Sequence, residues 1–139
     1  MQLRPAMSRD VTSILDRLSE QHRAEYAKVG YPGAAFDNRL ARFLSNGDST
    51  VLEFDGAPQA LLSIGPGGNG TWLMATREYF DKGLGSIRAS RGHMAAKARQ
   101  YGTIVAYVGS DHPQTTKWMK AIGFAYVGDA WDMKIFLYR

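Results

Sequence analysis

One stretch of the sequence, residues 71–124, constrains the fold more than any other part of the chain. It contains, in order, a buried-strand pattern (TWLMAT), a glycine-rich turn (YFDKGLGS), a long helical pattern, a second buried-strand pattern (TIVAYV) and a short helix that ends in Gly-Phe. A strand that runs into a Gly-x-Gly turn at a helix start can hold a phosphate, because free backbone N–H groups and the helix dipole favour negative charge. The order of elements therefore predicts a β-α-β unit with an anion site where its helix begins.

Length and composition limit the classes of protein to which the chain can belong. With 139 residues, of which 45% are hydrophobic and 22% charged, it can form one domain with a substantial core. Cysteine is absent, which excludes disulfides, thiolate metal sites and a cysteine nucleophile. No apolar run reaches the ~20 residues of a membrane helix, and the first ten residues lack the apolar core of a signal peptide, so we expect a cytoplasmic protein.

The remaining segments read as short elements around the central unit. The residues before Pro5 form an opening strand, Ser8 caps a first helix, and a second helix spans residues 37–45. Two strands joined by an Asp-Gly turn at residues 55–56 form a hairpin, the GPGGNG segment forms a flexible tip, and two further strands close the chain. The predicted fold class is α+β, as one domain over residues 1–139, with a mixed, mostly antiparallel sheet and helices on both faces.

Three of these segments, in this order, resemble the GNAT superfamily of acetyl-coenzyme A–dependent N-acetyltransferases. The opening LRPAMSRDVTSIL is similar to the first strand and helix of that family, YFDKGLGS to its pyrophosphate loop, and TTKWMKAIGF to its last helix. The resemblance implies the GNAT fold, acetyl-CoA as cofactor, and transfer of an acetyl group to an amine on a small molecule or a protein. It leaves the acceptor unidentified and a homodimer open, and it gives no reason to expect a membrane as partner.

The same resemblance implies which residues hold the cofactor. Backbone N–H groups at Met74, Ala75 and Thr76 would bind the pantetheine arm and polarise the acetyl carbonyl. The start of the following helix would bind the pyrophosphate, and the residues that contribute there are Lys82, Gly83, Leu84, Gly85 and Ser86.

Two alignments with the family loop remain open. If the Gly-x-Gly is formed by Gly83 and Gly85, then Phe80 stands where the family has Arg or Gln, and the helix is two residues longer than usual. If residues are counted back from the helix end instead, Lys82 takes the basic position. Ile87 then takes the second small position, where its side chain would crowd a pyrophosphate.

The sequence offers few side chains for catalysis. The nearest carboxylate after the TWLMAT strand is Glu78, which could act as the general base, and Glu53 lies on an earlier strand. The preferred interpretation of each is a solvated surface carboxylate. His112 precedes the last helix and would be either a base or the helix cap. Met119 stands where the family has a proton-donating Tyr, and a thioether cannot donate a proton. No residues have persuasive metal-ligand spacing, so we predict no metal.

Basic side chains gather in and just before the long helix, and the formal net charge is +4. The residues concerned are Lys82, Arg88, Arg91, Lys97 and Arg99. The preferred interpretation is a solvated helix face, and contact with the phosphates of a cofactor comes second. Nucleic acid comes last, because the aromatic residues that normally interleave with such charge are missing.

The departures at Phe80, Ile87 and Met119 support a second hypothesis. Small podophage proteins once described as internal virion proteins keep a shortened version of this fold, in which the last helix survives and the phosphate loop is poorly kept. The KAIGF ending and the basic helix resemble that group more closely than a housekeeping acetyltransferase. The chain would then be a catalytically degenerate binding or virion-associated protein in the host cytoplasm, and a thermal-shift titration with acetyl-CoA separates the two hypotheses.

Overall fold

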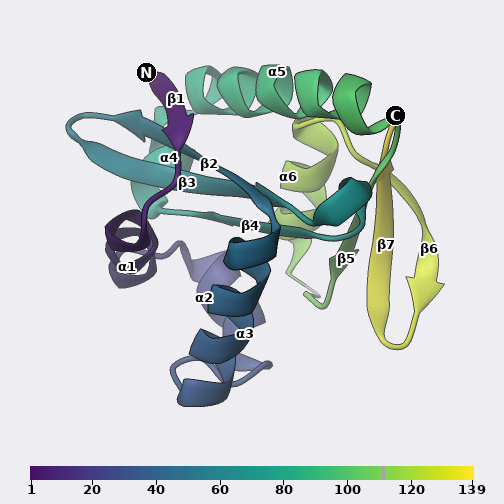
Figure 1. Cartoon of the computed structure of the whole chain (residues 1–139), viewed down its shortest axis with the longest axis horizontal. Coiled ribbons are helices and arrows are strands. Elements are labelled where there is room, and N and C mark those ends of the chain that lie inside the picture. Colours follow the sequence, from purple (N-terminus) through teal and green to yellow (C-terminus); the bar gives the residue numbers. More distant parts are fainter. Residues whose placement is uncertain (111) are drawn as a thin grey trace.

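The computed structural model describes residues 1–110 and 112–139, which form seven strands and six α-helices (Figure 1). The strands are β1 (Gln2–Pro5), β2 (Asp48–Phe54), β3 (Ala57–Ile64), β4 (Thr71–Ala75), β5 (Ile104–Val108), β6 (Ala125–Ala130) and β7 (Met133–Tyr138). The helices are α1 (Ser8–Asp16), α2 (Glu20–Ala27), α3 (Ala34–Asn46), α4 (Arg77–Lys82), α5 (Leu84–Tyr101) and α6 (Pro113–Ala121), with a 3-10 turn at Pro66–Gly68. Among the described residues, no helix combines the length and apolar character needed to cross a membrane.

The strands form two antiparallel sheets that meet through one parallel contact. The larger sheet has the order β1-β2-β3-β4 and the smaller one the order β5-β7-β6. They join where Asn69 bridges to Val105 and where the N–H of Gly70 donates to the Val105 carbonyl at 2.9 Å. Beyond this contact β4 and β5 diverge (Figure 1). The predicted mixed, mostly antiparallel arrangement is confirmed, and its β-α-β unit is the splayed form, with a wedge between β4 and β5.

Helices cover both faces of the larger sheet, as predicted. Figure 1 shows α5 along one face and α1, α2 and α3 on the other. Because side chains alternate along a strand, neighbours on β3 enter different cores. Leu62 is buried in the core that contains Met94 of α5, and Leu61 in the core that contains Ile14 and Phe36. Full burial of each such side chain stabilises the fold by roughly 1.5–3 kcal/mol, so packing on both faces of the sheet contributes to the stability of the domain.

The segment predicted as an open turn before the long helix has a different structure. Residues 79–82 belong to α4, which begins after Thr76, whose Oγ1 accepts the N–H of Tyr79 at 3.2 Å. Gly83 then reverses the chain with a φ of 71° and leads directly into α5. The stretch 77–82 contains no Gly or Pro and has a good N-cap, and these local preferences favour a helical turn over an open loop.

The helices after β1 also differ from the prediction. The N-cap of α1 is Met7 rather than Ser8, and the Asp10 carboxylate reaches back to accept the Met7 N–H at 2.8 Å. The sequence did not predict α2, which begins after Ser19, whose Oγ accepts the N–H of His22. The break between α1 and α2 contains neither Gly nor Pro, so it carries no strong local signal.

The GPGGNG segment, predicted as a flexible tip, packs closely against the start of β5. The N–H of Gly65 donates to the carbonyl of Gly70 at 2.9 Å and closes the loop. Gly68 has a φ of 84°, and a Cβ at this position would lie 2.3 Å from the carbonyl oxygen of Thr103. Glycine therefore allows the close approach that fixes the point where the two sheets meet.

Candidate functional site

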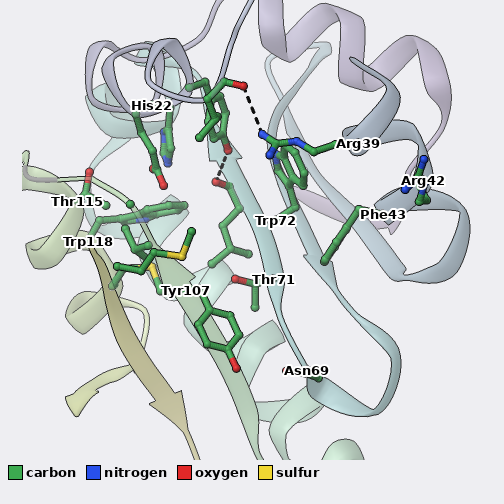
Figure 2. A pocket seen from close by; sticks show the side chains of 18 of the residues that line it. His22, Arg39, Arg42, Phe43, Asn69, Thr71, Trp72, Tyr107, Thr115 and Trp118 are labelled. Carbon is green, nitrogen blue, oxygen red and sulfur yellow. Dashed lines mark hydrogen bonds between the residues drawn. The ribbon is translucent and has the colours of Figure 1, made fainter. Parts of the chain in front are cut away.

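A cavity of about 700 Å³ lies where β4 and β5 diverge (Figure 2). Its walls come from α2, α3, β4, β5 and α6, and most of them are apolar. The lining residues with functional groups that matter below are Glu25, Arg39, Arg42, Trp72 and Trp118. Small-molecule sites usually have volumes of about 300–1,000 Å³, so this cavity has the size of a ligand site.

Glu25 on α2 is the carboxylate of this cavity. Burial in the mainly apolar wall raises its pKa from 4.5 to about 7, and a hydrogen bond from the backbone of Gly109 and the charge of Lys28 oppose that rise. Gly109 follows directly after β5, so the carboxylate lies at the open end of the wedge. A carboxylate with a pKa near neutrality is ionised in part at pH 7 and still basic enough to accept a proton from an amine.

The sequence contained a signal for this residue that the prediction did not use. His22, Glu25, Tyr26 and Val29 stand at positions i, i+3, i+4 and i+7, which places them on one face of a helix. All four line the cavity. The signal was missed because α2 itself was not predicted.

A cluster of aromatic rings separates the cavity from α5. The His22 ring packs edge-on against Trp118 with centroids 4.9 Å apart, and Phe80 packs against both rings. Tyr79 lies behind Trp118, and its hydroxyl is 2.7 Å from Oγ of Ser90 on α5. Burial lowers the pKa of His22 to about 3, so this imidazole is neutral at pH 7 and forms a wall rather than a base.

The free edge of β4 is partly covered by the segment that joins α1 to α2. The N–H of Ser19 donates to the Ala75 carbonyl at 3.0 Å, and Leu18 forms a bridge with Thr76. Further along the strand, the Tyr26 hydroxyl donates to the Leu73 carbonyl at 2.9 Å (Figure 2).

Only one of the three backbone donors predicted for the pantetheine arm faces the wedge. The N–H of Thr76 donates to Gln59 of β3, and because backbone groups alternate along a strand, Met74 also faces β3. Ala75 faces the opposite way, toward the wedge. Of the three predicted N–H groups, that of Ala75 therefore remains a candidate donor to the pantetheine arm or the acetyl carbonyl.

The predicted pyrophosphate residues lie together at the start of α5. The first amides of a helix have no partner inside it, and Leu84, Gly85 and Ser86 are in this position. The Ser86 hydroxyl is not free, because it donates to the carbonyls of Tyr79 and Gly83. Lys82 turns away, with its Nζ 4.0 Å from the Asp55 carboxylate and 5.3 Å from the centre of the Phe54 ring.

The fit to coenzyme A is therefore partial. The amides at the start of α5, which have no partner inside the helix, suit a phosphate, and the Ala75 N–H suits a carbonyl. The same edge of β4 is already partly occupied, because the Ala75 carbonyl accepts the N–H of Ser19.

The side chains predicted for catalysis lie outside the cavity. The Glu78 side chain is 52% exposed, with its carboxylate 3.8 Å from the Arg17 guanidinium. His112 is the N-cap of α6, where its Nδ1 accepts the N–H of Gln114 at 3.2 Å. Glu53 pairs with Arg4. The described residues contain no cluster of three or more acidic, His or Cys side chains able to hold a metal.

The fold can be compared with proteins of known structure. By sequence, the chain matches no protein family and no curated protein. In three dimensions it is similar to the PaiA N-acetyltransferase from Thermoplasma acidophilum in complex with coenzyme A, with a TM-score of 0.67, 12% identity, and 99% of this chain and 98% of that chain covered. It is also similar to the GNAT domain of PAT from S. lividans, with a TM-score of 0.71, 18% identity, and 98% and 88% of the two chains covered.

A third similar structure is a putative acetyltransferase from Salmonella typhimurium with its cofactor acetyl-CoA, with a TM-score of 0.58, 17% identity, and 99% and 92% of the two chains covered. At these identities the likeness shows the fold alone. The chain has the fold of the GNAT acetyltransferases, as its sequence predicted.

Proposed function

We propose that the chain, as one GNAT-like domain over residues 1–139, is an acetyl-CoA–dependent N-acetyltransferase whose acceptor amine binds beside Glu25. The observation that carries this proposal is the position of Glu25, in a cavity of ligand size at the open end of the wedge, with a pKa of about 7. An aliphatic amine is protonated at neutral pH and must lose a proton before it can attack a thioester. A carboxylate with a near-neutral pKa suits that task.

Each end of the site has a separate part in this proposal. Acetyl-CoA supplies the activated acetyl group when bound. The amides of Leu84, Gly85 and Ser86 would hold its pyrophosphate, and the N–H of Ala75 would donate to the acetyl carbonyl. Glu25 would orient the amine and accept its proton as the amine nitrogen bonds to the acetyl carbon. The C–S bond would break, and coenzyme A would leave as a thiolate that takes up a proton from solvent. The apolar walls of the cavity limit the access of water to the reacting groups.

Two carboxylate variants test the proposal. Thiol release from acetyl-CoA is measured with a panel of amines for the parent chain, Glu25→Gln and Glu78→Gln. We expect Glu25→Gln to lower kcat/KM by about 10²–10⁴-fold, which is the usual contribution of a general base, and Glu78→Gln to remain close to the parent. A larger loss of kcat/KM in Glu78→Gln than in Glu25→Gln, or equal activity of all three proteins, would contradict the assignment of Glu25 as the general base.

One observation favours a second candidate, a binding protein that keeps the fold without the chemistry. The segment Arg17–Ser19 pairs with the end of β4, on the edge where a pantetheine arm would otherwise lie. The phage relationship suggested by the sequence belongs with this candidate. A protein without a cofactor site would show no rise in Tm with acetyl-CoA. If the protein binds acetyl-CoA, ligand at one hundred times its dissociation constant raises the free energy of unfolding by about 2.7 kcal/mol, and the Tm rises with it.

A further inference from the structure

The cavity carries charges of both signs at separate places, and this arrangement restricts the amine that it can hold. Building on the function proposed above, we infer that the acceptor is a small amine that also carries a carboxylate, of amino-acid or dipeptide size, with an apolar or aromatic body. Its amine lies at Glu25, and its carboxylate lies at Arg39 and Arg42.

The positive end of the cavity is formed by α3. Arg39 and Arg42 are three residues apart on the helix, and both are exposed residues in the lining of the cavity. Figure 2 shows Arg39 beside Trp72 and Arg42 further out on α3. Arg39 Nη2 donates to the Val29 carbonyl at 3.3 Å. Within the described residues neither guanidinium has an ion-pair partner, whereas Arg4 is held by two carboxylates. Their charge is available to an anion, and guanidinium geometry suits a carboxylate.

The negative end is Glu25 alone. It is the single carboxylate among the described residues that line the cavity, so an ammonium group has one place to pair. Glu25 comes from α2 and the two arginines from α3, so charges of opposite sign stand on different walls. A ligand with one charge of each sign satisfies both walls, whereas a simple amine leaves the arginines without a partner.

The wall between the charged groups is aromatic. Trp72 and Phe43 pack edge-on with ring centroids 5.7 Å apart, and both line the cavity (Figure 2). The indole N–H of Trp72 is buried beside the hydroxyl of Tyr26, which is its polar neighbour in the fold. The rings between the charged groups therefore suit an apolar or aromatic ligand body.

Binding of three related probes tests the inference without any cofactor. The probes are L-phenylalanine, L-phenylalaninamide and 3-phenylpropanoic acid, which differ in whether they carry a carboxylate, an amine or both. Each is titrated into the full chain by NMR, with the indole N–H of Trp72 as reporter. We expect L-phenylalanine to bind and each of the other probes to bind at least about tenfold more weakly, because a charged hydrogen bond is lost in each case.

Variants of α3 separate a specific carboxylate site from general attraction to a basic protein. The double change Arg39→Gln and Arg42→Gln should weaken L-phenylalanine about tenfold and leave L-phenylalaninamide unchanged. Arg99→Gln, at an exposed site on α5, removes one positive charge elsewhere and should leave both affinities unchanged. Equal affinity for L-phenylalanine and its amide overturns the inference, as does an unaffected double variant, a matching loss in Arg99→Gln, or no binding of any probe.

The inference and the proposed function fail in different ways. If the probes bind in the expected order but no acetyl group is transferred to L-phenylalanine, the proposed function is overturned and the ligand class stands. If amines without a carboxylate, or lysines on a protein, are acetylated with the higher kcat/KM, the ligand class is overturned and the transferase stands.

Discussion

Trp118 donates its indole N–H to the hydroxyl of Tyr79 at 3.0 Å, and the same hydroxyl lies 2.7 Å from Oγ of Ser90. Both aromatic side chains are buried. The phenol oxygen of α4 therefore contacts side chains from both α5 and α6. The contact places the side of Trp118 that faces away from the cavity against α4 and α5. A change at Tyr79 therefore acts on the wall of the site through the core.

Replacing this hydroxyl tests how much the contact contributes. In Tyr79→Phe the Trp118 N–H loses its acceptor and Ser90 loses one partner, while the ring volume stays nearly the same. We expect a loss of about 1–3 kcal/mol in the free energy of unfolding, measured by urea denaturation. Tyr126→Phe is the matched control, because Tyr126 bonds to Asp129 on the surface, and it should change stability little. Equal effects of the two changes would contradict the prediction.

Asp10 should make the stability of the chain depend on acid pH. Its carboxylate accepts from both terminal nitrogens of Arg4, at 2.7 and 2.8 Å, and from the Met7 N–H, and the Arg4 contact lowers its pKa below the ordinary 3.8. A folded-state pKa below the unfolded value stabilises the fold above pH 3.8, and this contribution disappears as the pH falls through the folded-state pKa.

Asp10→Asn should therefore remove a pH-dependent part of the stability. At pH 7 we expect the change to lower the free energy of unfolding by about 1.5–3 kcal/mol, because it weakens charged hydrogen bonds. Between pH 2 and 5 the free energy of unfolding of the variant should vary less with pH than that of the parent. Asp81→Asn, at an exposed position of α4, should keep the parental pH dependence. The comparison requires urea unfolding at several pH values, and parallel curves for the parent and Asp10→Asn would rule out this contribution.

The fold was predictable where glycine, proline and apolar runs mark the ends of elements. The turn at Asp55-Gly56 has positive φ values of 54° and 73° and joins β2 to β3, as the sequence indicated. The number of helices before β2 was not predictable in this way. The break after α1 is fixed by pairing of Leu18 with Thr76, which is distant in sequence and leaves no local signature.

The site was harder to predict than the fold, because its parts are brought together from separate elements. Glu78 was selected because it follows β4 closely in sequence, yet α4 turns it toward solvent. Glu25 precedes β4 by many residues and reaches the cavity through the same helix whose Tyr26 bonds to Leu73 of β4. Closeness to β4 along the chain did not predict the carboxylate of the cavity. The helical spacing of residues in α2, which places them on one face, would have predicted it better.

Two neighbouring glycines test whether the loop at residues 65–70 fixes the junction of the sheets. Gly67 and Gly68 both have positive φ, so Ala is strained at either position. A Cβ at Gly67 meets nothing within 4 Å, whereas one at Gly68 meets the Thr103 carbonyl. Gly68→Ala should therefore destabilise the chain by about 1–3 kcal/mol more than Gly67→Ala, as measured by urea unfolding. Equal losses would show that the close approach is not needed.

Glu25 should have opposite effects on stability and on activity as the pH rises. Its folded-state pKa of about 7 lies above the ordinary 4.5, so the folded chain holds a proton that the unfolded chain has released between these values. Stability contributed by this group is fully present below pH 4.5 and is lost as the pH rises to about 7. If Glu25 is the general base, kcat/KM should rise over the upper part of that range, because only the ionised form accepts a proton.

Glu25→Gln separates these effects because glutamine does not titrate. At pH 8 the variant should be more stable than the parent by roughly 1–3 kcal/mol, and at pH 4.5 the two should be nearly equal. Its residual activity should lack the rise through pH 7. Glu20→Gln, at an exposed position of the same helix, should keep both the stability profile and the rate profile of the parent. Parallel stability profiles of the parent and Glu25→Gln between pH 5 and 8 would show that Glu25 is ionised at its ordinary pKa, and the carboxylate would then be too weak a base for the part assigned to it.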